Sequence, residues 1–371
     1  MGQKNIKRRD FLKKTGTAAV VASTGVLAAP NVIAGPRKHR WLMSTTWPPN
    51  SPLFQSGVDR FAKRVKELTA GQLTIKVFAA GELIPAFEAF EAASKGSVVQ
   101  AGAGASYYWA GKSAAAQWFS AVPFGLNAQG MNSWIYAGGG LKLWEETYAP
   151  FNLIPRPYGN TGLQMGGWFN KEINSMADFK GLKMRIPGLG GKVIQKVGGT
   201  PVLLPGGEIF TALERGVIDA TEFVGPLHDM RMGLHNAAKY YYTPGWHEPG
   251  TVLEVFFNKT AYEKLPKRLQ AALDTAAVES NLWMLAEFDA QNGDALRTLI
   301  NEHKVKIRHF STSTLDELRS VALEVREEEA SKNKQAQKVH QAFNKFQDKV
   351  GVWSAVSEHP YHQLIAKKVK L

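Results

Sequence analysis

The sequence contains no cysteine among its 371 residues. This absence excludes disulfide-stabilised scaffolds, iron–sulfur clusters, thiolate zinc sites and cysteine nucleophiles. The chain also lacks any apolar run of the roughly 20 residues that a membrane-spanning helix needs. Hydrophobic residues make up 44% and charged residues 21%, a globular balance that argues against collagen-like, disordered and coiled-coil chains. At roughly 150 residues per domain, the length predicts two domains.

Sequence motifs of nucleotide binding and catalysis are missing as well. The run Gly188–Lys192 lacks the Ser or Thr of a P-loop and the third glycine of a dinucleotide fingerprint, so we interpret it as a turn. His247 and Glu248 are followed by Pro249 and Gly250 rather than by the rest of a zinc-protease motif, and no G-x-S-x-G elbow occurs. We therefore expect a protein that is not an enzyme.

Much of the net charge of +13 belongs to the N-terminal segment. Residues 1–34 carry six Lys or Arg against one Asp, which assigns +5 to this segment and +8 to the rest. A basic start, the apolar run Thr15–Ala29 and small residues around Val32–Ala34 predict an export signal, and Arg8–Lys13 resembles the twin-arginine type. We expect a soluble periplasmic protein. The remaining charge is diffuse and lacks the aromatic interleaving of an RNA-binding sheet, so we expect no nucleic-acid partner.

Strand and helix patterns alternate along the chain, which predicts an α/β fold. The expected strands are Trp41–Thr45, Leu73–Phe78, Leu163–Phe169, Leu182–Ile186, Val217–Val224 and Thr251–Asn258. The expected helices are Ser51–Leu68, Pro266–Met284, Leu285–Glu302 and a long one from Ser313 or Thr314 to about Val350.

The expected elements form two α/β units, and the chain crosses between them more than once. This pattern predicts a two-domain clamshell with hinge strands and a long C-terminal helical region. We assign the export signal to 1–34, domain I to 37–157 plus 252–310, and domain II to 158–251. The C-terminal helices at 311–371 are a candidate dimerisation element.

Four polar residues interrupt apolar segments of the second unit. Glu222 lies in a run apolar enough to be buried, where an unpaired carboxylate is costly, so it needs a partner. Arg185, Gln164 and Glu248 stand in similar surroundings, and the pattern alone does not decide whether Arg185 is solvated. The aromatic-rich segment 102–140, which includes Tyr107 and Tyr108, fits either a cleft wall or a loop-rich core patch.

Several contiguous strings resemble one family of transport proteins. Asp178–Arg185, Gly198–Pro201 and Leu204–Glu222 are similar to solute-binding proteins of tripartite ATP-independent periplasmic (TRAP) transporters. Ala121–Leu126 and Tyr240–Trp246 resemble the branch that binds 2-oxo and 2-hydroxy monocarboxylates, the α-keto-acid and lactate binders.

The resemblance implies a clamshell receptor with a defined site. Arg185 is expected to pair with the substrate carboxylate through its planar fork. A cation is expected beneath the substrate, held by Gln164, Glu222, the Phe223 carbonyl and Glu248, whose oxygen donors suit Ca²⁺ or Na⁺. Counting the charges of two glutamates, one arginine and the substrate favours Ca²⁺. Trp47, Tyr107 and Tyr108 are the expected aromatic walls, with a tyrosine hydroxyl near the 2-oxo or 2-hydroxy oxygen.

These residues predict a periplasmic receptor that captures a small monocarboxylate with its cation and delivers it to integral-membrane permease subunits. A ligand-sensing module for a signalling partner shares the fold and the pocket and stays open as an alternative. An exported hydrolase or oxidoreductase is disfavoured by the missing motifs. Relatives that exchange a C-terminal helix suggest a homodimer.

Overall fold

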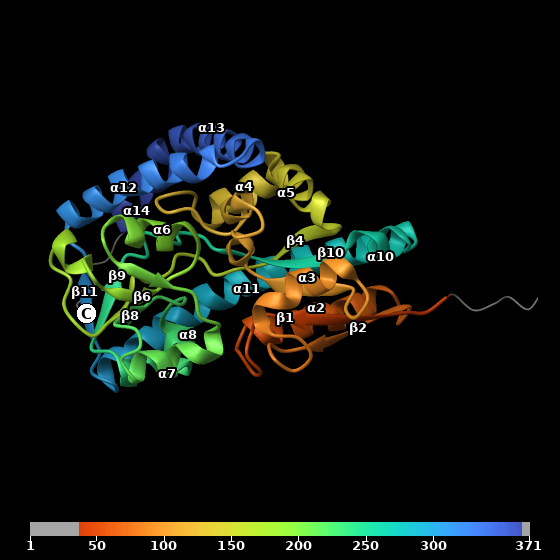
Figure 1. Ribbon diagram of the computed structural model, residues 1–371, viewed down its shortest axis with the longest axis horizontal. Coiled ribbons are helices and arrows are strands. Elements are labelled where there is room, and N and C mark those ends of the chain that lie inside the picture. Colours follow the sequence, from red (N-terminus) through yellow and green to blue (C-terminus); the bar gives the residue numbers. More distant parts are fainter. Residues whose placement is uncertain (1–36, 366–371) are drawn as a thin grey trace, which may run out of the picture. The chain divides into compact units, whose positions relative to one another are not determined.

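The computed structural model describes residues 37–365, so the predicted export signal lies outside the described residues. Two mixed β-sheets with helices packed around them form this part of the chain (Figure 1). The first sheet has the order β2-β1-β3-β10-β4 and contains β1 (His39–Thr45), β2 (Leu73–Phe78), β3 (Ala101–Gly104), β4 (Leu153–Asn160) and β10 (Val252–Asn258). Strand β1 pairs in parallel with β2 and β3, whereas β10 pairs antiparallel with β3 and β4.

The second sheet has the order β11-β9-β5-β8-β6-β7. Its strands are short: β5 (Gly167–Phe169), β6 (Lys183–Arg185), β7 (Thr200–Val202), β8 (Ala220–Thr221), β9 (Tyr240–Thr243) and β11 (Lys306–His309). Strand β6 pairs in parallel with both β7 and β8, whereas β5 is antiparallel to β8 and β9. The α/β, two-sheet architecture agrees with the predicted fold class.

Helices surround both sheets. They are α2 (Phe54–Leu68), α3 (Ala89–Lys95), α4 (Ala128–Ala137), α5 (Gly140–Tyr148), α6 (Gly188–Lys196), α7 (Ile209–Glu214), α8 (Pro226–Arg231), α9 (Leu234–Ala237), α10 (Lys259–Glu263), α11 (Lys267–Asn301), α12 (Thr312–Ser331), α13 (Lys334–Val356) and α14 (Glu358–Ile365). Short 3-10 turns occur at Ala86–Glu88, Ser106–Trp109, Ala114–Phe119, Ala149–Phe151, Met176–Phe179 and Gly206–Glu208. None of the described helices has both the length and the apolar composition required to cross a membrane.

Local patterns are accurate where burial follows a simple period. Helix α2 lies within the expected helix Ser51–Leu68 and buries one face that includes Phe54, Phe61 and Val65. The expected strand Leu73–Phe78 has the same bounds in the structure. Ser175 caps the turn Met176–Phe179 through a reciprocal capping box with Asp178.

The predicted helix boundaries in the C-terminal third are wrong in two places. Helix α11 is one continuous helix rather than two. No proline interrupts its backbone hydrogen bonds at Met284 and Leu285, where the two expected helices meet. The single long helix expected up to Val350 is two helices, α12 and α13, which pack against each other (Figure 1). Asn333 separates them, since its side chain accepts a hydrogen bond from the Ala336 amide and begins α13.

Three assignments near the second sheet also require correction. The strand expected at Leu163–Phe169 is reduced to β5, because Gly167, the first residue of β5, adopts a positive φ of 118° that interrupts the extended backbone. The strand expected at Val217–Val224 is reduced to β8, after which the chain turns toward α8. The glycine-rich run interpreted as a turn forms the first turns of α6.

The predicted domain boundaries stay a prediction, although the sheets bear on them. Strands β1 to β4 and β10 lie within 37–160 and 252–258 and form the first sheet. The second sheet takes its strands from 167–243 and adds β11, which pairs with β9. The range 252–310 assigned to domain I therefore contributes one strand to each sheet.

Candidate functional site

The candidate site forms where β6 and β8 end at the same edge of the second sheet. These strands are parallel neighbours, and their register places Arg185 opposite Thr221. The amide of Glu222, the residue after β8, donates to the Arg185 carbonyl oxygen over 3.2 Å. Parallel pairing thus brings together an arginine and a glutamate that are 37 residues apart in the sequence.

Arg185 and Glu222 form a buried ion pair between Arg185 Nη1 and Glu222 Oε1. Each residue is only 1% exposed, so the structure excludes the solvated interpretation of Arg185. The guanidinium also donates to the carbonyl oxygens of Glu222 at 3.1 Å and Leu204 at 3.3 Å. Burial of two charges is tolerated because the remaining donors have partners.

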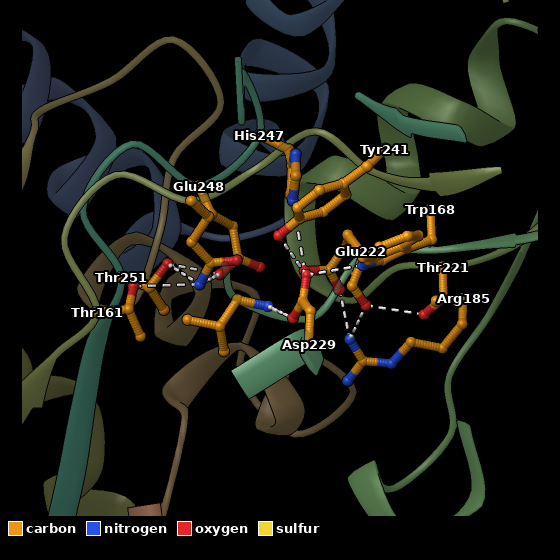
Figure 2. A network of polar contacts seen from close by, with 12 residues as sticks. Thr161, Trp168, Arg185, Thr221, Glu222, Asp229, Tyr241, His247, Glu248 and Thr251 are labelled. Atoms are coloured by element: carbon orange, nitrogen blue, oxygen red, sulfur yellow. Dashed lines mark hydrogen bonds and ion pairs between the residues drawn. The ribbon is translucent and has the colours of Figure 1, made fainter. Parts of the chain in front are cut away.

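Glu248 lies beside this pair, in a second polar group with Thr161 and Thr251 (Figure 2). Glu248 Oε2 accepts hydrogen bonds from Gln164 Nε2 at 2.9 Å and from the Thr251 hydroxyl at 2.5 Å. Gln164 Nε2 also contacts the Thr161 and Thr251 hydroxyls. Gln164 Oε1 is buried and has no partner within the described residues. An orphaned amide oxygen is costly in the interior unless it accepts from, or coordinates, something else.

Three of these side chains could jointly hold a cation. Glu222, His247 and Glu248 are all buried, and each offers a ligand atom within 4.8 Å of the others. Their two carboxylates and the free Oε1 of Gln164 are the donors that hard cations prefer. The residues therefore fit a cation, and the fit rests on the orphaned amide oxygen as well as on the carboxylates.

Burial controls the protonation of the cluster. Desolvation raises the pKa of Glu222 to about 7, although the Arg185 charge opposes the shift. Desolvation and the nearby Glu222 charge raise the pKa of Glu248 to about 7. Desolvation lowers the pKa of His247 to about 4, so its imidazole is neutral at pH 7. When Glu222 and Glu248 are both ionised, Arg185 is the one permanent positive charge of the cluster, so the cluster carries a net negative charge.

The predicted aromatic residues lie at different distances from this cluster. Tyr107 and Tyr108 form a T-shaped pair with ring centroids 4.9 Å apart, and the Tyr108 hydroxyl is 3.5 Å from Arg185 Nη2. Trp47 packs 6.3 Å from the Tyr108 ring, but its Nε1 donates to the Tyr158 hydroxyl at 2.8 Å. A Cβ on Gly188 would lie 3.0 Å from Tyr107 Cβ, so glycine at the start of α6 permits this close approach.

The structure bears on the two alternatives that the sequence left open for the aromatic-rich segment. Trp109, Trp118 and Trp134 are buried in a hydrophobic core. Tyr107 and Tyr108 instead lie against Arg185 and the acidic cluster. The part of the segment with these tryptophans is therefore a core patch, and the cleft wall expected at Tyr107 and Tyr108 stays a prediction.

Comparison with known proteins identifies the family. The model of bacterial extracellular solute-binding protein family 7, DctP, matches residues 43–333. The chain belongs to this family. The resemblance seen in the sequence is thereby confirmed, and family 7 proteins are solute-binding proteins.

Three relatives illustrate how similar other family 7 proteins are. A monocarboxylate 2-oxoacid-binding periplasmic protein of Nostoc is 44% identical over 362 residues, which cover 96% of this chain and 98% of the relative. A TRAP periplasmic solute-binding protein from Pseudoalteromonas atlantica, with bound sodium and pyruvate, is 41% identical with a TM-score of 0.86, covering 89% of this chain and all of that one. One from Colwellia psychrerythraea, with bound calcium and pyruvate, is 40% identical with a TM-score of 0.85 over the same shares.

Two residues near the site of this family 7 protein were not predicted from the sequence. His247 is 1% exposed, and its Nε2 lies 3.4 Å from Glu222 Oε2. Its only sequence signal is its position next to Glu248. Asp229 lies near Glu222 and accepts hydrogen bonds from Trp168 Nε1 at 3.0 Å and from the Tyr241 hydroxyl at 2.7 Å. No motif marks Asp229, because its partners Trp168 and Tyr241 lie on two other elements, 61 and 12 residues away in the sequence.

Proposed function

We propose that this family 7 protein is the periplasmic receptor of a TRAP transporter. It binds a small 2-oxo or 2-hydroxy monocarboxylate such as pyruvate or lactate, together with a cation, and delivers it to integral-membrane permease subunits. One observation supports this proposal most directly. Buried Arg185 lies next to two buried glutamates and to the Gln164 amide oxygen, which has no partner within the described residues. The pyruvate bound to two solved relatives supports the substrate class.

Arg185 anchors the substrate in this proposal. Its guanidinium is planar, always charged and able to donate two parallel hydrogen bonds to a carboxylate. Nη2 faces the Tyr108 hydroxyl, which offers a polar group beside the anchor for the 2-oxo or 2-hydroxy oxygen. Tyr107, Tyr108 and Trp47 exclude water from the small apolar body of the substrate.

Gln164, Glu222, the Phe223 carbonyl and Glu248 would hold the cation. When bound, the cation supplies positive charge that screens the carboxylates from each other and attracts the substrate oxygens. With both glutamates ionised, Arg185 and a substrate carboxylate leave a net charge of −2, since His247 is neutral. Ca²⁺ brings the sum to zero, so we propose Ca²⁺, with Na⁺ as the alternative.

A binding screen tests the proposed function. Thermal unfolding of the purified protein is measured with pyruvate, lactate, longer 2-oxo acids and dicarboxylates, each with and without EDTA. Binding to the folded state raises the melting temperature by mass action, so cation-dependent stabilisation by pyruvate or lactate is the expected result. Stabilisation by dicarboxylates alone, or none by any of these acids, would reject the monocarboxylate assignment.

Export and self-association complete the proposal. We infer export to the periplasm through the twin-arginine-like segment, which precedes the described residues. We also infer a homodimer built through the last helices. Several large apolar side chains of α13 and α14 are exposed, namely Val352, Trp353, Val356, Tyr361, Leu364 and Ile365. A run of exposed apolar residues at one end of a chain is typical of a protein–protein contact.

A further inference from the structure

Asp229 of α8 is a buried carboxyl residue, 1% exposed, near Glu222 of the candidate cation site. Its Oδ2 accepts hydrogen bonds from Trp168 of β5 and Tyr241 of β9. Its Oδ1 accepts from the backbone amide of Val224 at 3.2 Å. Figure 2 shows the Asp229 carboxylate as the point where these contacts meet. One oxygen is thus anchored to the sheet, while the other reaches the segment that follows β8.

The bond to Val224 determines how the preceding carbonyl is oriented. The Val224 N–H and the Phe223 C=O belong to one peptide group, which is planar and trans, so they point in opposite directions. A carboxylate on the N–H side therefore directs the Phe223 oxygen away from Asp229. A charge-assisted hydrogen bond to the N–H also polarises the carbonyl, which makes its oxygen a better cation ligand.

Neighbouring contacts hold the same stretch of backbone from both sides. The Glu222 amide donates to the Arg185 carbonyl at 3.2 Å, and the Val224 carbonyl accepts from the Met165 amide at 3.0 Å. These two hydrogen bonds hold the backbone on either side of the Phe223–Val224 peptide group. The plane of that peptide group can still rotate unless its own N–H is held by a hydrogen bond. The Asp229 Oδ1 contact supplies that restraint.

We propose that Asp229 is a positioning residue for the cation site, holding the Phe223–Val224 peptide so that the Phe223 carbonyl oxygen can bind the cation. The inference rests on the proposed function, because it takes that carbonyl as a ligand. Hydrogen-bond partners that orient metal ligands typically contribute about 10- to 100-fold to metal affinity.

Asp229→Asn tests the proposal because an amide has only one acceptor oxygen. Two donors, Trp168 Nε1–H and the Tyr241 hydroxyl, face Oδ2, whereas only the Val224 N–H faces Oδ1, so the amide oxygen of Asn should stay with the first two and its N–H should face Val224. We expect Ca²⁺ affinity, measured by calorimetry with pyruvate present, to fall by about tenfold or more. Tyr241→Phe removes a donor from Oδ2 only and should destabilise the protein without that loss of affinity.

A second substitution separates positioning from general stability. Trp168→Phe removes the competing donor, so in the double variant with Asp229→Asn the amide oxygen can turn to Val224 and its N–H can face the Tyr241 hydroxyl. Trp168 is fully buried and stacks on Tyr241 at 4.0 Å, so the double variant should melt lower than Asp229→Asn alone. Its Ca²⁺ affinity should nevertheless recover. Opposite changes in the two measurements are not expected of a residue with a purely structural role.

An experiment on the unsubstituted protein covers the case in which the variants do not fold. Phe223–Val224 is the only Phe-Val pair in the sequence, so ¹³C′-Phe and ¹⁵N-Val labelling reports one correlated NMR signal from this peptide. Without cation, the Val224 amide should already exchange slowly with solvent. Adding Ca²⁺ and pyruvate should shift the Phe223 carbonyl carbon.

The outcomes distinguish this inference from the proposed function. Unchanged Ca²⁺ affinity in Asp229→Asn, no recovery in the double variant, or a rapidly exchanging Val224 amide before cation is added would each overturn the role of Asp229. Pyruvate and Ca²⁺ would still bind to the unsubstituted protein in those cases. A protein that binds neither would overturn the proposed function and this inference together.

Discussion

Arg185 and Glu222 form an ion pair that water does not reach, since each is 1% exposed. The pair exists because β6 and β8 are parallel neighbours that end together. Glu222 neutralises the guanidinium within the fold, and it also belongs to the set of donors proposed for the cation. In the proposed function, two new interactions replace this ion pair. The cation binds the Glu222 carboxylate, and the substrate carboxylate binds the Arg185 guanidinium.

Replacing Arg185 by Met should abolish substrate binding, and it should also lower the melting temperature, because Glu222 loses its buried partner. Removing one partner of a buried ion pair typically costs about 3–5 kcal/mol, or two to four decades of affinity. Titration calorimetry with pyruvate measures the loss. Arg156→Met is the matched control, because Arg156 pairs with Glu145 and Asp274 elsewhere in the fold. Pyruvate affinity within threefold of the unsubstituted protein in Arg185→Met would refute the anchor.

The tyrosine hydroxyls should contribute modestly to substrate affinity. We expect Tyr107→Phe or Tyr108→Phe to weaken pyruvate and lactate binding by about 2- to 12-fold, the effect of losing a hydrogen bond worth about 0.5–1.5 kcal/mol. Tyr148→Phe, which removes a buried hydroxyl that donates to Glu254, is the control and should leave affinity unchanged. If both site variants bind normally, the tyrosines serve only for packing.

Glu248→Gln should shift the cation preference from Ca²⁺ toward Na⁺. The substitution removes one negative charge, after which a monovalent cation suffices to balance the buried site. Elemental analysis of protein purified without chelator, followed by pyruvate titrations in Ca²⁺-free Na⁺ buffer, measures the preference. Glu254→Gln removes a buried carboxyl elsewhere and should not change it. Full pyruvate affinity of the unsubstituted protein without calcium would contradict the proposed Ca²⁺.

Glu254 should make folding stability depend on pH. This residue of β10 is buried, and desolvation raises its pKa from 4.5 to about 8, although hydrogen bonds from Trp109 and Tyr148 oppose the shift. Its contribution to stability is fully present below pH 4.5 and is lost as the pH rises through 8, because ionisation is disfavoured only in the folded state. The melting temperature should therefore fall from pH 5 to pH 8.5.

Glu254→Gln should reduce that fall in melting temperature. Three other buried carboxyl groups, those of Glu222, Asp229 and Glu248, have raised pKa values and act in the same direction, so the slope should decrease without vanishing. Exposed Glu302→Gln is the control. Equal slopes in Glu254→Gln and the unsubstituted protein would reject the assignment.

The exposed apolar end of α13 should mediate dimer formation. Light scattering at micromolar concentration is expected to give a dimer for the purified protein and a monomer for Trp353→Glu, because a charge cannot be buried unpaired in an apolar contact. Leu282→Glu changes an equally exposed apolar residue of α11, 70% exposed against 68% for Trp353, and should leave the dimer intact. A monomeric unsubstituted protein would remove the proposed dimer.

Local pattern in the sequence was sufficient to predict much of the architecture. Alternating strands and helices predict the α/β class, and helix α2 lies within its expected range and buries one face, because burial along one element depends on its own period. Contiguous strings around Arg185 and Glu222 identified the family. Strand lengths next to the site could not be predicted, because Gly167 interrupts the strand pattern through backbone conformation rather than through side-chain hydropathy.

The sequence by itself determined the fold class, the family and the type of chemistry available: one arginine, acidic and amide oxygens, and aromatic rings. The family resemblance implied that Gln164, Glu222 and Glu248 share one site, but only the tertiary structure decided which hydrogen bonds they make and which other side chains join them. Gln164 and Glu248 are 84 residues apart yet share a hydrogen bond, and His247 and Asp229 acquire their partners from other strands and loops. Such contacts arise from strand order and chain turns, which depend on the packing of the whole sheet and leave no signal in the residues next to them.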